Sequence, residues 1–413
     1  MTITYYPPFG TTPANPINAQ FTGMQLDAFG RLRTSNPFTL FDSQNRYAAD
    51  TSFDTLTATG GTATYLTNQS AVALTTTTSS GSSVVRQSFR NFPYQPGKSL
   101  FTMMTFSMNA AKTGLRQRVG YFNTNNGVYL EQNNSVSFVV RTFTGGSVDN
   151  SRSVAQANWN GDPLNGTGAS GLTLDLTKTQ ILFFDFEWLG VGNVRCGFII
   201  NGQFIICHTF SNANSLSVVY MQTAILPIRY EITNTAATAS ASTLQQICCT
   251  LMSEGGYEQS SQPYSARQTT TITVGTSFVP ILSIRLNSSY LGAIVLPHDV
   301  SFLPTATGNY EVALIRNATL TGATWAGTLS AGQVDIDLAA TALTNTADNI
   351  VQSYYTAATN QSQNAITASI GYNWDLQLGV SLANVSDTYT LAARTLTGTN
   401  TGIGSLTYYN LTV

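Results

Sequence analysis

Asp185 and Glu187 are the residues of this sequence whose types and spacing come nearest to those of a catalytic pair. They stand two apart in an apolar run, so on a β-strand both side chains would project from one face. Paired carboxyl groups can cleave a glycosidic bond, one as the acid and the other as the nucleophile. A Glu-x-Asp-x-Glu arrangement would need a further acid where Phe183 stands. We therefore expect no catalytic residues, and interpret the pair as groups that bind loop backbone or Arg195 on the next strand.

Cys196 and Cys207 flank a predicted hairpin whose turn is Asn201-Gly202. Asn-Gly fits a type I′ turn best, because both central residues need positive φ. The resulting register pairs Ile200 with Gln203, Phe198 with Ile205, and Cys196 with Cys207. Directly opposed cysteines lie within reach of a disulfide. In a protein without a visible signal peptide, however, two reduced thiols packed in the core are favoured.

The other residues that could bind a metal are scattered. Cys248 and Cys249 are adjacent and would face opposite sides of a strand, which indicates core residues. His208 and His298 fall in different predicted domains. We expect no metal site and no cofactor.

Trp159 lies in a loop rich in Gly and Asn, and this composition is typical of a surface on which a sugar ring stacks. Trp159 is therefore a candidate glycan contact. The alternative is a tryptophan that closes the end of a β-sandwich.

The N-terminal region combines prolines with a local concentration of arginine and phenylalanine. Proline removes backbone donors and fixes φ, which indicates an extended arm over residues 1–47. In a chain with 9% charged residues, such density suggests contact with a partner. The candidate docking residues are Phe29, Arg31, Arg33, Phe38, Phe41 and Arg46. The alternative is an arm that lies over its own domain.

The overall composition is poor in charge and rich in Thr, Ser, Asn and Gly. The 413 residues include 42% hydrophobic residues and carry a formal net charge of −2. A chain with so few positive charges does not have the basic surface that binds nucleic acid, so we expect no nucleic-acid partner. No apolar run approaches the length of about 18 residues that a membrane-spanning helix needs, so we expect no membrane insertion.

Short strand-like segments separated by turn residues predict an all-β protein. We expect a jelly-roll or concanavalin-like β-sandwich over residues 48–258, a linker over 259–268 and a second, smaller β-sandwich over 269–413. The only helix expected is a short one near 350–358.

Four segments together resemble a family of structural proteins of tailed-bacteriophage virions. They are LDAFGRLRTSNPFTLFDSQNRY (26–47), DPLNGTGASGLTLDLTKTQILFFDFEWLGVGNVRCGFIINGQFI (162–205), LPIRYEI (226–232) and LMSEGGYE (251–258). The resemblance implies a non-enzymatic component of a capsid or tail, localised to the virion after assembly in the host cytoplasm. It implies other virion proteins as partners and a homo-oligomer, with a trimer favoured by analogy. The alternatives are a lectin-like module that binds host glycans and a polysaccharide depolymerase that uses Asp185 and Glu187.

Overall fold

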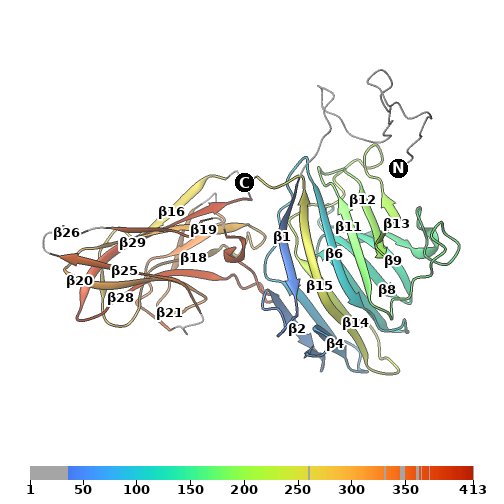
Figure 1. Cartoon of the computed structure of the whole chain (residues 1–413), viewed down its shortest axis with the longest axis horizontal. Coiled ribbons are helices and arrows are strands. Elements are labelled where there is room, and N and C mark those ends of the chain that lie inside the picture. The colour runs from blue at the N-terminus through green and yellow to red at the C-terminus, as the bar shows by residue number, and fades with distance from the viewer. Residues whose placement is uncertain are drawn as a thin grey trace, which may run out of the picture.

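The computed structural model describes residues 36–258, 261–329, 332–344, 349–359, 362–363, 365–371 and 373–412. In these residues the chain forms two β-sandwiches that follow one another along the long axis of the molecule (Figure 1). The predicted all-β class, a large sandwich followed by a smaller one, is confirmed. Helical structure in this part of the chain is limited to short 3-10 turns such as η1 (Gln156–Asn158) and η3 (Trp374–Leu376), and none of it could span a bilayer.

The N-terminal sandwich consists of two antiparallel sheets. The front sheet has the order β13 (Gln203–Phe210), β12 (Val194–Ile200), β11 (Gln180–Phe186), β6 (Ser99–Ser107), β15 (Ser242–Glu254), β4 (Ala71–Thr76) and β3 (Thr62–Leu66), and β1 (Pro37–Gln44) also pairs with β15. The back sheet has the order β10 (Asp149–Ala155), β9 (Ser135–Thr142), β8 (Gly127–Asn133), β7 (Leu115–Phe122), β14 (Ile228–Asn234), β5 (Ser83–Ser88) and β2 (Phe53–Ala58).

Aromatic side chains join the two sheets face to face. The ring of Phe184 on β11 lies 6.1 Å from that of Phe138 on β9. The ring of Phe186 lies 5.6 Å from that of Tyr121 on β7. All four side chains are at most 1% exposed, and burying a side chain of this size stabilises the fold by about 1.5–3 kcal/mol. Since alternate residues of a strand face opposite sides, these contacts also fix which residues of β11 point outward.

The hairpin of β12 and β13 follows the predicted register near its turn and departs from it further along. Asn201 and Gly202 have φ of 53° and 76°, as a type I′ turn requires. The pairs Ile200–Gln203 and Phe198–Ile205 are confirmed. A bulge then shifts the register so that Cys196 pairs with His208. The prediction that Cys196 opposes Cys207 directly is therefore wrong, because the bulge leaves Cys207 without a cross-strand partner.

The N-terminal boundary of the large sandwich lies earlier than predicted. Residues 37–44 form β1 of the front sheet, where the extended arm was expected to continue to residue 47. Proline is tolerated at the first position of a strand, which is where Pro37 stands. Phe41 is buried, with its ring 4.8 Å from that of Phe92. Residues 1–35 lie outside the described residues.

The C-terminal sandwich also packs two main sheets together. One has the order β16 (Pro263–Arg267), β29 (Asn400–Asn410), β19 (Val295–Pro304) and β27 (Ile366–Ser369), with β17 (Ile272–Val274) also on β29. The other has the order β22 (Trp325–Leu329), β23 (Val334–Asp337), β18 (Val279–Leu286), β28 (Thr388–Thr395), β20 (Gly308–Arg316), β25 (Ile350–Thr359) and β26 (Ser362–Gln363). A small ribbon pairs β21 (Thr319–Thr321) with β24 (Ala342–Thr344).

Two predictions fail in this half of the chain. The linker expected over 259–268 ends earlier, because β16 belongs to the second sandwich and buries Ala266 completely. The helix expected near 350–358 is strand β25. Residues 353–357 of this strand alternate between exposed and half-buried, which is the period of a strand and not of a helix.

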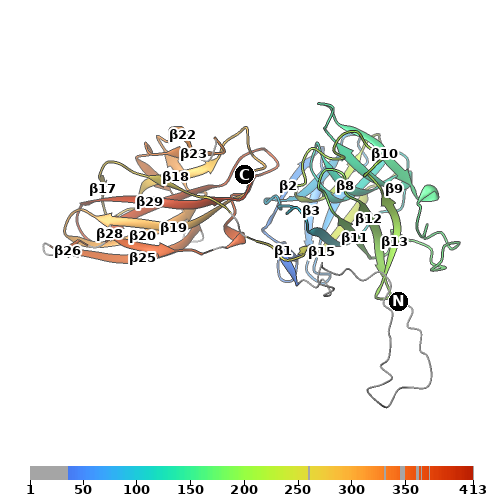
Figure 2. The same cartoon turned by 90° about the horizontal axis from the view of Figure 1, so that it is seen from above.

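The two sandwiches meet at a junction held by hydrogen bonds, and Figure 2 shows the narrow connection from above. The bonds run from the Arg90 Nη1 to the Trp374 carbonyl (2.6 Å), from the Gln377 amide to the Asn91 carbonyl (2.9 Å), from the Val380 N–H to the Phe89 carbonyl (2.8 Å) and from the Leu382 N–H to the Asp54 carboxylate (2.6 Å). Backbone groups take part in all four bonds, so the junction has a defined geometry.

Charged side chains on the outer side of the back sheet are buried in a connected network. Glu231 on β14 is 5% exposed and accepts hydrogen bonds from Arg229 (2.9 Å), Arg118 (3.4 Å) and Arg116 (3.3 Å). Burial alone would raise the pKa of Glu231, and the three guanidinium groups outweigh it, so this pKa lies below its ordinary value. The folded protein therefore favours the ionised carboxylate.

We predict that Glu231→Gln destabilises the protein by about 3 kcal/mol at pH 7, because it leaves buried guanidinium groups without their counter-charge. A group with a depressed folded-state pKa contributes stability above its unfolded pKa and loses it as pH falls through the folded pKa. The difference between wild type and variant should therefore shrink below about pH 4. Urea denaturation at several pH values measures this. The exposed Glu258→Gln is the control and should change little; an equal loss at all pH values would contradict the prediction.

Candidate functional site

Asp185 lies on the outer side of the front sheet, beside a cleft of about 590 Å³. It is 8% exposed, and its carboxylate accepts hydrogen bonds from the Ser99 hydroxyl and the Arg195 guanidinium. Arg195 stands directly opposite on β12. The interpretation of Asp185 as a partner of Arg195 is confirmed, and this carboxylate is held in place by groups of the protein itself.

Glu187 contributes to the same cleft from a different position than predicted. Strand β11 ends at Phe186, so Glu187 lies in the following loop, exposed, and accepts a hydrogen bond from the Asn193 N–H (3.3 Å). Glu254 at the end of β15 also lines this cleft, and burial, followed by the charge of Asp185, raises its pKa. These carboxyl groups come from three separate elements, which the two-residue spacing of Asp185 and Glu187 alone could not reveal.

All four cysteines are free thiols in the structure. Cys196 is fully buried, and burial raises the pKa of its thiol well above the ordinary range. Burial also raises the pKa of Cys207 to about 12. These two residues therefore pack as thiols in the core, which was the favoured sequence interpretation. Cys249 is likewise buried, whereas Cys248 is half-buried.

Trp159 is not accessible to a ligand. It is 6% exposed, its ring stacks on Phe138 at 4.5 Å, and its indole N–H donates to the Val154 carbonyl (3.1 Å). The candidate glycan contact at Trp159 is therefore wrong, and the alternative of a residue that closes the sandwich holds. Its packing position could not be read from the loop composition.

The candidate docking residues divide into three groups. Phe29, Arg31 and Arg33 lie outside the described residues. Phe41 is buried and so is not free for a partner, whereas Phe38 is half-buried, with its ring 5.9 Å from that of Tyr257. Arg46 is exposed and donates to the Gln44 side chain (3.1 Å). Residues 37–44 therefore pack against their own domain, which was the alternative to a docking arm.

The two histidines occupy separate structural positions. His208 Nδ1 accepts a hydrogen bond from the Asn160 N–H (3.2 Å), and burial, followed by the charge of Arg152, lowers the pKa of the ring. His298 in the second sandwich pairs with Asp299 (2.7 Å). Among the residues that the structure describes, no cluster of His, Cys, Asp and Glu could hold a metal ion.

Sequence reasoning missed a cleft of about 710 Å³ at the junction of the two sandwiches. Its lining comes from four distant parts of the sequence, near residues 87–91, 123–126, 222–229 and 289–293, with further contributions from the C-terminal region. Amide side chains dominate it: Gln87, Asn91, Asn123, Asn125, Asn126, Gln222, Gln333 and Asn384. The abundance of Asn and Gln was visible in the sequence, but their convergence depends on the domain junction.

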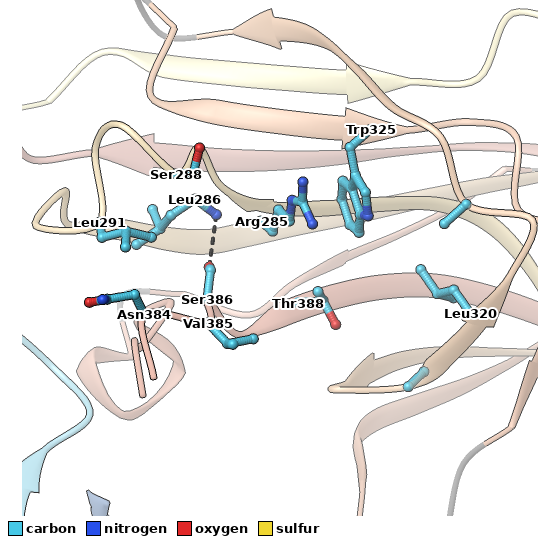
Figure 3. Close-up of a pocket in the computed structure, with 12 residues that line it drawn as sticks. Arg285, Leu286, Ser288, Leu291, Leu320, Trp325, Asn384, Val385, Ser386 and Thr388 are labelled. Atoms are coloured by element: carbon cyan, nitrogen blue, oxygen red, sulfur yellow. Dashed lines mark hydrogen bonds between the residues drawn. The ribbon is translucent and has the colours of Figure 1, made fainter. Parts of the chain in front are cut away.

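A smaller pocket of about 380 Å³ adjoins this junction cleft, and Leu291 and Asn384 line both. Figure 3 shows Arg285 beside the indole of Trp325, with the guanidinium carbon 4.3 Å from the ring centroid. The Leu286 N–H donates to the Ser386 hydroxyl (2.9 Å) at the other end of the pocket. Its walls therefore combine one cation–π pair with apolar and hydroxyl groups.

No family model matches the sequence, and neither does any curated protein. Similar solved structures include a legume lectin-like domain from Entamoeba histolytica (13% identity, TM-score 0.29, covering 51% of this chain and 91% of that one). Others are a lectin from Bauhinia forficata in complex with GalNAc (10%, 0.30, 54% and 99%) and a β-glucanase from Bacillus licheniformis (11%, 0.33, 53% and 99%). At these identities and TM-scores they carry no argument about ligand or activity.

We predict that native protein treated with iodoacetamide at pH 8 reacts mainly at Cys248. Cys196, Cys207 and Cys249 should stay unmodified, because burial both shields them and raises their thiol pKa values. Mass spectrometry of peptides measures the modification. In denaturant all four thiols should react, and a Cys196–Cys207 disulfide found in untreated protein would contradict the prediction.

Proposed function

We propose that this protein is a non-enzymatic structural component of a tailed-phage particle, displayed on the virion surface of the capsid or tail. The resemblance of four sequence segments to virion structural proteins supports the class of protein. The observation that carries the proposal in the structure is a cluster of exposed aliphatic side chains at one corner of the large sandwich. Such clusters mark interaction surfaces when they are contiguous.

This apolar corner belongs to two loops, one between β11 and β12 and one after β13. Its side chains are Leu189 (55% exposed), Val191 (39%), Val218 (59%) and Val219 (38%). The Tyr220 N–H donates to the Gly190 carbonyl (2.9 Å), which holds the two loops together. A partner that covers these four side chains removes apolar surface from water, and this burial stabilises the complex.

The apolar corner lies beside the point where the N-terminal segment joins the sandwich. Leu189 and Glu254 line the same cleft, and Glu254 pairs with Pro37, the first residue of β1. The described chain therefore begins near this corner, with Pro37 as the first residue of β1. We propose that this corner and the N-terminal segment together contact another virion protein, and that the protein forms a homo-oligomer, with a trimer as the expected state.

The hydrogen bonds of Asp185, in the cleft that it lines together with Glu187 and Glu254, support a non-enzymatic role. The carboxylate of Asp185 accepts hydrogen bonds from Ser99 and Arg195 and is 8% exposed, so the protein's own groups occupy it and little of it faces the cleft. The sequence also has Phe183 where the third acid of the pattern would stand.

We predict that the double variant Leu189→Asn, Val218→Ser lowers the copy number of the protein on purified phage particles at least fivefold, because it removes apolar area from the contact. Asn is chosen at position 189 because Leu189 has a φ of 35°, which Asn tolerates. Quantitative mass spectrometry of particles measures the copy number. The matched control is Tyr355→Ser, Val385→Ser, which alters exposed apolar residues of the second sandwich. Equal incorporation of both double variants, or absence of the wild-type protein from particles, would contradict the proposal.

We further predict that the purified chain releases no reducing sugar from host surface polysaccharide, and that Glu187→Gln leaves this result unchanged. A reducing-end assay after prolonged incubation measures it. Release of sugar by the wild-type protein that is lost in Glu187→Gln would establish a depolymerase instead.

A further inference from the structure

We propose that the cleft between the two sandwiches binds a neutral saccharide. This inference goes beyond a role in particle assembly, which does not require the cleft to hold any ligand. It rests on the chemistry of the cleft walls, on how firmly they are held, and on the near absence of charge in them.

The cleft offers hydrogen-bonding groups that the protein does not use itself. In the described part of the chain, no hydrogen bond engages the side-chain amides of Asn125, Gln222 and Asn384. Each amide carries both donors and an acceptor, and can bind a pair of neighbouring sugar hydroxyls. The three amides come from both sandwiches, so a ligand in the cleft would contact the two domains at once.

An exposed aromatic ring stands at the same cleft. Tyr290, in the turn after β18, is 46% exposed and forms part of the lining. An aromatic ring with a polar tip presents an apolar face together with a hydroxyl group. A sugar ring matches this surface, because its C–H groups can pack on the tyrosine face while its hydroxyls reach the amides.

Hydrogen bonds fix the turns that carry these groups. The Asn123 carboxamide oxygen accepts from the Asn125 N–H (2.8 Å) and so sets the conformation of that turn. The Asn126 carboxamide oxygen accepts from the Gln222 N–H (3.0 Å) and ties the second loop to the first. On the other side, the Asn384 N–H donates to the Ser381 carbonyl (2.9 Å). A site whose parts are already held in place loses less entropy when a ligand binds.

The scarcity of charge in the cleft lining favours a neutral ligand. Among the described residues that line the cleft, Arg229 is the only one with a charged side chain, and its guanidinium group binds Glu231 (2.9 Å) and Gln87 (3.1 Å). A phosphate or sulfate group would find no free cation there. The volume of about 710 Å³ lies in the usual range for small-molecule sites, and the adjoining pocket beside Asn384 gives a longer chain room to continue.

The test is binding of the full chain to an array of neutral and acidic glycans, followed by calorimetry with the best neutral glycan. We expect Tyr290→Ala and Asn125→Ala each to weaken that binding about tenfold, the loss that follows when one good contact in a site is removed. The controls Tyr47→Ala and Tyr355→Ala remove tyrosines that are 87% and 64% exposed outside the cleft, and should bind as the wild type does. Raising the salt concentration from about 0.05 M to 0.5 M should leave the affinity unchanged, since no charge is involved.

Three results would overturn the proposal. They are the lack of binding to any neutral glycan, unchanged binding by both cleft variants, and binding confined to acidic glycans that disappears at high salt. Incorporation of Tyr290→Ala into particles, measured in parallel, shows separately whether the assembly role stands, because this variant leaves the apolar corner intact.

Discussion

The fold depends on the packing of two large antiparallel sheets against each other through aromatic side chains. Rings on β11 meet rings on β7 and β9 across the interface, and they are almost completely buried. This packing of the two sheets determines which face of each strand in the N-terminal sandwich points outward. It places Asp185 outward beside Arg195, and it uses Trp159 as part of the core. The positions of the loops at the ends of this sandwich, and with them the cleft beside Asp185, follow from this packing.

A second constraint is the scarcity of charge. Arg118 and Arg229 are buried in the network around Glu231, whose carboxylate offsets part of their charge. Little charge remains on the walls of the junction cleft, where amide groups take over the polar contacts. A surface with so little charge suits contacts made through shape, apolar area and neutral hydrogen bonds. An apolar corner for assembly and an amide-lined cleft for a neutral ligand are both consistent with such a surface.

The sequence predicted those features that depend on local rules. The all-β class, the order of the two sandwiches and the Asn201-Gly202 turn followed from residue alternation and from turn chemistry. The bulge at Cys207 could not be predicted from such rules, because the Asn201-Gly202 turn fixes the strand register only for the residues next to it. Strand β1 was not predicted, because the prolines and charges around it indicated an extended arm. Its pairing with β15 joins residues about two hundred positions apart, which no local pattern reveals. The junction cleft needs side chains from both sandwiches, so no local pattern could have located it.

The most direct test of the central claim, that this chain is a structural part of a phage particle attached through the apolar corner, is an electron cryomicroscopy reconstruction of the particle. We expect density for both sandwiches on the virion surface, with the loops of Leu189 and Val218 against a neighbouring protein and the C-terminal sandwich projecting. A reconstruction in which the chain is absent, or in which those two loops face solvent while another surface makes the contact, would contradict it.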